Sequence, residues 1–160
     1  MTTDGLQVKV RDFVTRSVSK VFETMLKMKL EVLDSSGGLS LEGDRVVGAV
    51  GFAGLATGVV YLQVTDPFGQ ILTNTLFGRK IATVSAPEEV NDVVGELSNM
   101  IGGNLKSYLS DYGLPCALSI PFITRGQSFA IQTKDGAWCE RFAFRYQEHL
   151  ALVQLCMKTN

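Results

Sequence analysis

A run without charged residues, from Val46 to Val64, constrains the fold of this chain more than any other segment. Its nineteen residues approach the length of a short membrane-spanning helix. The run is rich in β-branched and aromatic residues, however, and it has a glycine at position 54, near its middle. Such a glycine lets the chain turn back, so the pattern favours two adjoining buried strands, and a membrane span is the weaker alternative.

Two long segments have the apolar spacing of amphipathic helices. The first covers residues 6–28, with apolar side chains at Leu6, Val10, Phe13, Val14, Val18, Val21, Phe22 and Met25. The second covers about 86–112, with an apolar stripe at Val90, Val93, Leu97, Ile101, Leu105, Tyr108 and Tyr112. Ser85-Ala-Pro-Glu88 matches a capping box with Ser85 as the N-cap, and Gly113 follows the last turn.

The remaining segments predict a shorter helix and several strands. Asp66 as N-cap and Pro67 in the first turn open a helix that extends to about residue 77. Strands are expected over residues 30–33, 117–123, 128–132, 138–146 and 149–157, with a hairpin turn at 134–136. We therefore expect an α+β fold, in which helices pack on a largely antiparallel sheet, and one domain over residues 1–160.

Charge and cysteine content exclude several kinds of function. The net charge is −1, and no basic stripe suited to nucleic acid is visible. Cys116, Cys139 and Cys156 lack the CxxC spacing of metal sites, and His149 is the single histidine. We expect buried or unreactive thiols in a reducing compartment. The N-terminal segment has no apolar signal core, so a cytoplasmic location is expected.

The second long helix also carries a polar stripe opposite its apolar one. Asp92, Glu96, Asn99 and Gly103 follow one another at spacings of four, three and four residues. Glycine inside a helix costs about 1 kcal/mol relative to alanine. This helix contains three glycines, at positions 95, 102 and 103, so a close approach of another surface is expected there. A carboxylate and an amide on an exposed helical face are usually only solvated, so the stripe alone does not establish a function.

The order of these residues adds a family resemblance. The segment Asp92-VVG-Glu96-LS-Asn99-MIGGN, followed by Leu118-Ser-Ile-Pro121, resembles the signature of the CheC/CheX/FliY family of chemotaxis phosphatases. The likeness is most specific to CheX-type domains and extends from about residue 10 to 155. It implies a phosphatase that stimulates hydrolysis of the phospho-aspartate on a CheY-like response-regulator receiver domain, in chemotaxis or a related two-component pathway.

The two long helices also align with each other, as the family's internal duplication implies. Ser17, Val21 and Thr24 of the first helix correspond to Asp92, Glu96 and Asn99 of the second. The resemblance thus implies two half-domains related by a pseudo-twofold axis. The first half lacks both the glutamate and the asparagine, so one site per chain is expected.

The resemblance implies a role for each residue of the stripe. Asn99 would hold the attacking water in line with the phosphorus atom, and Glu96 would pair with a lysine of the receiver. Asp92 would add a polar contact or be only solvated, and Pro121 would shape a turn beside the helix. The glycines would let the receiver backbone approach; they are Gly95, Gly102 and Gly103.

No cofactor of its own is expected for the chain, because Mg2+ would come with the bound receiver. The resemblance also implies a homodimer. Two alternatives to the enzyme remain open. One is a non-catalytic module that binds a receiver or joins a chemosensory or flagellar complex. The other is a structural homodimer domain whose polar stripe is incidental, although intact Glu96 and Asn99 argue against it.

Overall fold

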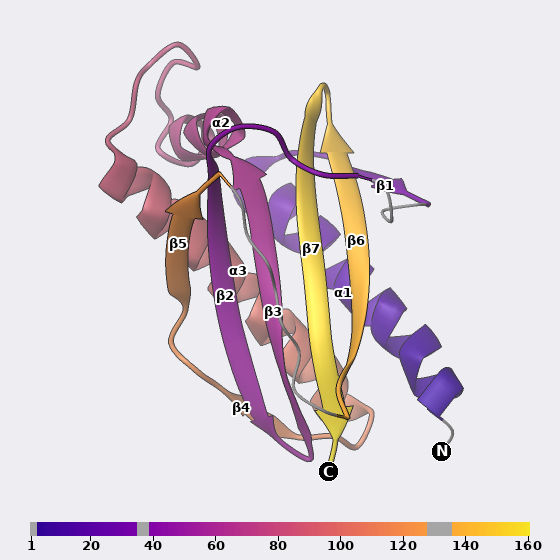
Figure 1. The fold of residues 1–160 in the computed structure, drawn as a ribbon. Coiled ribbons are helices and arrows are strands. Elements are labelled where there is room, and N and C mark those ends of the chain that lie inside the picture. The colour runs from indigo at the N-terminus through magenta and orange to yellow at the C-terminus, as the bar shows by residue number, and fades with distance from the viewer. Residues whose placement is uncertain (1–2, 35–38, 128–135) are drawn as a thin grey trace.

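The computed structural model describes residues 3–34, 39–127 and 136–160, which form three helices and seven strands (Figure 1). The helices are α1 (Thr3–Leu26), α2 (Asp66–Leu76) and α3 (Pro87–Asp111). The strands are β1 (Glu31–Leu33), β2 (Arg45–Gly54), β3 (Ala56–Thr65), β4 (Cys116–Leu118), β5 (Phe122–Gly126), β6 (Trp138–Tyr146) and β7 (His149–Thr159).

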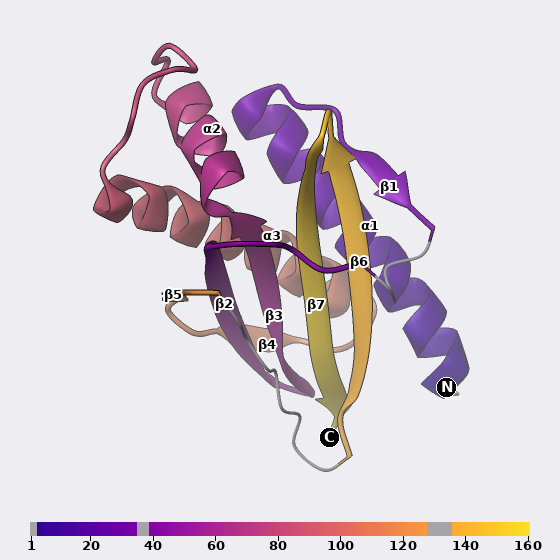
Figure 2. The ribbon, with the colours of Figure 1, turned by 45° about the horizontal axis from the view of Figure 1, so that its top comes forward.

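The strands form one sheet in the order β1-β6-β7-β3-β2-β4, and β5 pairs with β2 beyond β4 along the same edge. Every pairing within the described residues is antiparallel. The three helices lie on one face of the sheet, as Figures 1 and 2 both show. The expected α+β fold, with helices packed on an antiparallel sheet, is confirmed.

The sheet is symmetric in its strand order. Exchanging β1, β2 and β3 with β4, β6 and β7 reverses the order and leaves it otherwise unchanged. The first half contains β1, β2 and β3, and the second contains β4, β6 and β7. The two halves meet where β3 pairs with β7. The edge strand of each half pairs with a strand of the other half, because β1 pairs with β6 and β4 pairs with β2. This exchange is the arrangement that a half-domain repeat with a pseudo-twofold axis requires.

The charge-free run folds as the β2–β3 hairpin, with Val50 paired to Val60. Its valines alternate, so that Val46 and Val50 face the helices and are fully buried. Gly48 allows α3 to approach closely, since a Cβ atom there would lie 2.1 Å from Oγ of Ser98. Among the helices of the described chain, none is long and apolar enough to cross a membrane.

Helices α1 and α3 pack against each other over this sheet. Their contact includes stacked rings of Phe13 and Tyr108, with centroids 5.4 Å apart. The apolar stripes predicted for both helices form the core, apart from Met25, whose exposed fraction is 37%. Helix α1 ends at Leu26, two residues before the predicted end. Leu26 in the last turn and Met28 after it are both buried in the core.

Both predicted helix caps are wrong by one residue. Helix α2 is capped by Thr65, whose Oγ1 accepts from the backbone N–H of Phe68 at 3.3 Å. Helix α3 has Ala86 at its N-cap, and Oε1 of Glu89 accepts from the Ala86 N–H at 3.2 Å. Ser85 is buried, and its hydroxyl donates to Oδ1 of Asn74 instead, so it holds the preceding loop.

The single strand predicted over residues 117–123 is divided into β4 and β5, which both pair with β2. Pro121 lies between them and cannot donate to the ladder, which explains the interruption. The Ser119 hydroxyl instead accepts from the Gly51 N–H at 2.9 Å. The strand predicted at 128–132, and most of the turn at 134–136, lie outside the described residues.

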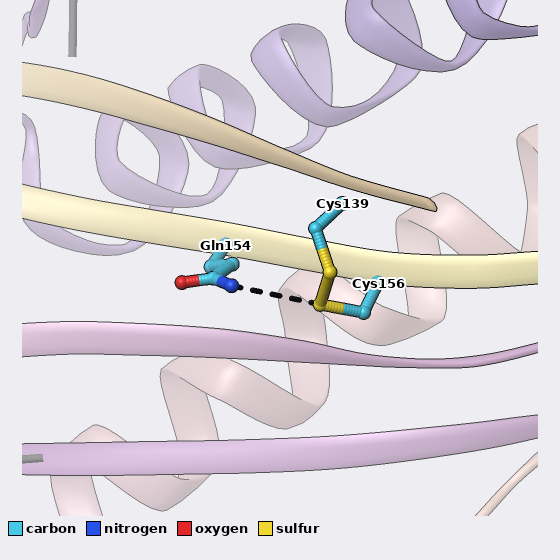
Figure 3. The surroundings of a disulfide bond; sticks show 3 residues. All are labelled: Cys139, Gln154 and Cys156. Atoms are coloured by element: carbon cyan, nitrogen blue, oxygen red, sulfur yellow. Dashed lines mark hydrogen bonds between the residues drawn. A yellow bond between two sulfur atoms is a disulfide. The ribbon is translucent and has the colours of Figure 1, made fainter. Parts of the chain in front are cut away.

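The cysteines differ from the prediction. Cys139 of β6 and Cys156 of β7 are register partners and form a disulfide (Figure 3), so the expectation of free thiols is wrong for both. Nε2 of Gln154 lies 3.6 Å from the Cys156 sulfur. Cys116 is the buried thiol that was expected, and burial raises its pKa.

Candidate functional site

A shallow groove of about 440 Å³ runs between α3 and the segment around Pro121. Its lining residues are Asn91, Asp92, Gly95, Glu96, Asn99, Pro121 and Ile123. Five of these were singled out from the sequence, where they were assigned to one stripe of a helix and to a downstream turn. In the structure the two segments face each other, and each forms one wall of the groove.

Strand β5 lies very close to α3 at the groove. Ile123 points toward the helices from its register position opposite Gly48. A Cβ atom on Gly95 would lie only 3.3 Å from Cδ1 of Ile123. Gly95 therefore lets the strand approach the helix closely, and it also lines the groove.

The polar side chains of the groove are accessible. Asp92 and Glu96 are exposed, and Asn99 is half-buried. Glu96 and Asn99 are separated by three residues, so they lie about 4.5 Å apart along the helix axis, on neighbouring positions of one face. Neither Asp92 nor Glu96 forms an ion pair within the described chain. Two carboxylates beside an amide give the groove a cation-binding and hydrogen-bonding character.

The other two glycines of α3 lie outside the groove. Gly102 is buried against the sheet, where an added Cβ atom would lie 3.0 Å from Cγ1 of Val50. The expectation that Gly102 admits a receiver backbone is therefore corrected, since its close approach is to β2. Gly103 is partly exposed, and the place where its Cβ atom would stand is open space.

Sequence reasoning missed three residues at the site. Asn91 and Ile123 line the groove, and Arg125 of β5 bonds to Asn91. Asn91 precedes Gly95 and Asn99 by four and eight residues, so a search along the helix face could have found it. The positions of Ile123 and Arg125 depend on which strand lies beside α3, and no local pattern carries that information.

The corresponding positions of α1 do not form a second groove. Ser17 and Val21, which align with Asp92 and Glu96, are buried. The Ser17 hydroxyl donates to the carbonyl of Phe13. Thr24, which aligns with Asn99, is exposed, and its hydroxyl donates to the carbonyl of Lys20. Helix α1 therefore has no counterpart of the pair formed by Glu96 and Asn99.

No group of three or more histidine, cysteine, aspartate or glutamate side chains suited to a metal ion occurs in the part of the chain that the structure describes. His149 stacks on Phe68, with ring centroids 5.0 Å apart. Its imidazole therefore belongs to the packing beneath α2, away from the groove.

The sequence matches the family model described as chemotaxis phosphatase CheX over residues 46–145. The chain belongs to the CheX family. The matched region contains the whole of α3 and Pro121, and with them every residue that lines the groove. Comparison with curated proteins gave no match.

Solved structures of CheX and CheC-like proteins have the same fold. A CheC-like superfamily protein from Shewanella sp. PV-4 is 27% identical with a TM-score of 0.81, over 94% of this chain and 98% of that one. The chemotaxis protein CheX from Vibrio vulnificus is 23% identical with a TM-score of 0.80, over 93% and 96%. CheX in the CheX–CheY–BeF3–Mg2+ complex from Borrelia burgdorferi is 20% identical with a TM-score of 0.72, over 92% and 96%.

Proposed function

We propose that this CheX-family protein accelerates hydrolysis of the phospho-aspartate on a CheY-like receiver domain. The observation that carries the proposal is the open groove along α3, in which Glu96 and Asn99 are neighbours on one helical face. A receiver is itself a folded protein, so a substrate-binding site for it must be shallow and accessible, as this groove is.

Asn99 is the residue that we assign to the chemistry. An acyl phosphate is intrinsically labile, and its hydrolysis passes through a loose transition state, so placing the attacking water is the main task. The Asn99 carboxamide oxygen accepts a hydrogen bond from that water and holds it in line with the phosphorus atom. Its half-buried position on α3 fixes the side chain better than a loop would.

Glu96 and Asp92 are assigned to docking. Glu96 lies one helical turn before Asn99, and its carboxylate forms no ion pair within the described residues. It can therefore pair with a lysine of the receiver and fix the orientation of the partner on α3. Asp92 is one further turn away and adds acidic character to the same wall. Pro121, on the opposite wall, shapes the turn that bounds the groove.

Magnesium belongs to the receiver in this proposal. The Borrelia burgdorferi relative was solved with CheY and Mg2+, which supports both a receiver as partner and a metal that arrives with it. This chain then needs no cofactor of its own. We also propose that residues 1–160 form one CheX-like domain, that the protein is cytoplasmic and that it assembles as a homodimer.

The test is the decay of a phosphorylated CheY from the same genome, followed with and without this protein. The proposal predicts a faster loss of phosphate, at a rate that rises with the concentration of the phosphorylated receiver and reaches a plateau at high concentration. Binding of the receiver is measured in parallel. Tight binding without faster decay would overturn the enzymatic role and favour a receiver-binding module; neither binding nor faster decay with any CheY of the genome would also exclude the module.

A further inference from the structure

Arg125 connects three elements at one end of the groove. Its guanidinium donates to Oδ1 of Asp66 at 3.0 Å, to the carbonyl of Pro87 at 3.0 Å and to Oδ1 of Asn91. These acceptors belong to the first residue of α2 and to the first turns of α3, whereas Arg125 belongs to β5. The arginine thus joins β5 to the helix that carries Glu96 and Asn99.

The contact with Arg125 determines which way the Asn91 amide faces. A guanidinium can only donate hydrogen bonds, so the Asn91 atom that faces it must be the carbonyl oxygen. The amide is planar, and its NH2 group therefore points away from Arg125. Asn91 lines the groove, and its Nδ2 has no acceptor among the described residues. Two N–H donors are thus available beside the groove.

Asn91 lies on the same wall as the candidate catalytic residue. It precedes Asn99 by eight residues, which is about 12 Å along the axis of α3. Gly95 lies midway between them and leaves the wall without a side chain there. A partner that reaches Asn99 from this side extends over Asn91 as well. Asp92 and Glu96, which line the groove beside Asn91, offer acceptors only, so Asn91 is the donor among these three lining residues.

We propose that Asn91 is a docking residue, which donates from Nδ2 to an oxygen acceptor on the phosphorylated receiver, and that Arg125 is the positioning residue that orients it. The acceptor is a main-chain carbonyl or a carboxylate, about two helical turns from the phosphoryl group. This inference rests on the proposed function and extends it, because it assigns a second contact that selects the partner. A donor in this place disfavours receivers that present an N–H or a cationic side chain there.

The test uses phosphorylated CheY from the same genome and the variants Asn91→Asp and Arg125→Gln. Asn91→Asp keeps an oxygen for Arg125 but replaces the donor by a second acceptor. We expect KM, and the Kd of the phosphorylated receiver, to rise at least about fivefold while kcat changes by less than about twofold. Arg125→Gln releases the amide and should raise KM in the native background.

The double variant separates positioning from a merely structural role. If Arg125 acts through Asn91, Arg125→Gln adds no further rise of KM once Asn91→Asp is present. An equal rise in both backgrounds would overturn the positioning role, and an unchanged Kd in Asn91→Asp would overturn the docking role. If wild-type protein binds the receiver without accelerating decay, the proposed function fails, whereas the Kd comparison still decides the role of Asn91.

Discussion

Cγ1 of Val50 lies 3.0 Å from the place where a Cβ atom on Gly102 would stand, so α3 and β2 pack without room for a methyl group there. At the neighbouring Gly103, a Cβ atom would meet no heavy atom within 4 Å apart from its chain neighbours and the backbone of its own helix. The two glycines are adjacent in one helix and differ mainly in what they face. Close packing at Gly102 holds α3 at a short distance from β2.

Replacing each glycine by alanine should therefore change the free energy of unfolding by different amounts. Gly103→Ala should raise the free energy of unfolding by about 1 kcal/mol, because alanine is the better helix former. Gly102→Ala gains the same propensity but must displace Val50, a stiff β-branched residue in the core. Urea unfolding should rank Gly102→Ala below Gly103→Ala. Equal stabilities would contradict the close packing of α3 on β2.

The ion pair between Arg79 and Glu89 predicts a pH-dependent stability. The hydrogen bond from Arg79 lowers the pKa of Glu89, and a second from the Ala86 N–H acts in the same direction. Because the pKa of Glu89 is lower in the folded state, the ion pair stabilises the protein at pH values above the ordinary pKa of the carboxyl, near 4.5. This stabilisation is lost as the pH falls through the lower pKa of the folded state. The stability gap between wild type and Glu89→Gln should be constant from pH 6 to 8 and shrink below about pH 4. A gap that is unchanged at pH 3 would contradict this assignment.

The disulfide predicts the thiol chemistry of the chain. Under non-reducing conditions one thiol, Cys116, should react with an alkylating reagent, and only after unfolding, because it is buried and burial raises its pKa. Reduction should expose two more thiols. Cys139 and Cys156 are 17 residues apart, so breaking their bond should lower stability by about 3 kcal/mol in the loop-entropy estimate. Mass spectrometry that counts three alkylated thiols without reduction would exclude the disulfide.

Glu96 should contribute to docking rather than to the chemical step. Glu96→Gln keeps the shape of the side chain and removes its charge, so the Kd of the phosphorylated receiver should rise and depend less on salt. The turnover at saturation should change little. The matched control is Glu88→Gln, which removes one exposed charge from the same helix outside the groove. Equal effects of the two variants on Kd would reduce the role of Glu96 to general electrostatics.

Much of the fold could be predicted because local patterns decide it. Apolar spacing identified both long helices, and a charge-free run of β-branched and aromatic residues with a central glycine identified the β2–β3 hairpin. The polar stripe of α3 follows from the same periodicity, since the face opposite a buried stripe must be exposed. Helical periodicity alone therefore sufficed to place Glu96 and Asn99 on an accessible face.

The remaining features depend on contacts between distant segments. Ser85 has the sequence of an N-cap, but a buried acceptor on Asn74 competes for its hydroxyl. The pairing of Cys139 with Cys156 requires the register of β6 on β7. The link from Arg125 to Asn91 requires β5 to lie beside α3, which the interruption at Pro121 permits. None of these neighbours can be identified from the spacing of residues in one segment.

The central claim is that Asn99 positions the water that hydrolyses the phospho-aspartate, and Asn99→Ala tests it most directly. Dephosphorylation of CheY is measured at saturating variant, with the Kd measured separately and Asn104→Ala, on the same helix outside the groove, as the control. The account predicts that Asn99→Ala binds within about threefold of wild type yet lowers the stimulated rate at least about 100-fold, while Asn104→Ala retains it. A normal rate in Asn99→Ala would contradict the account.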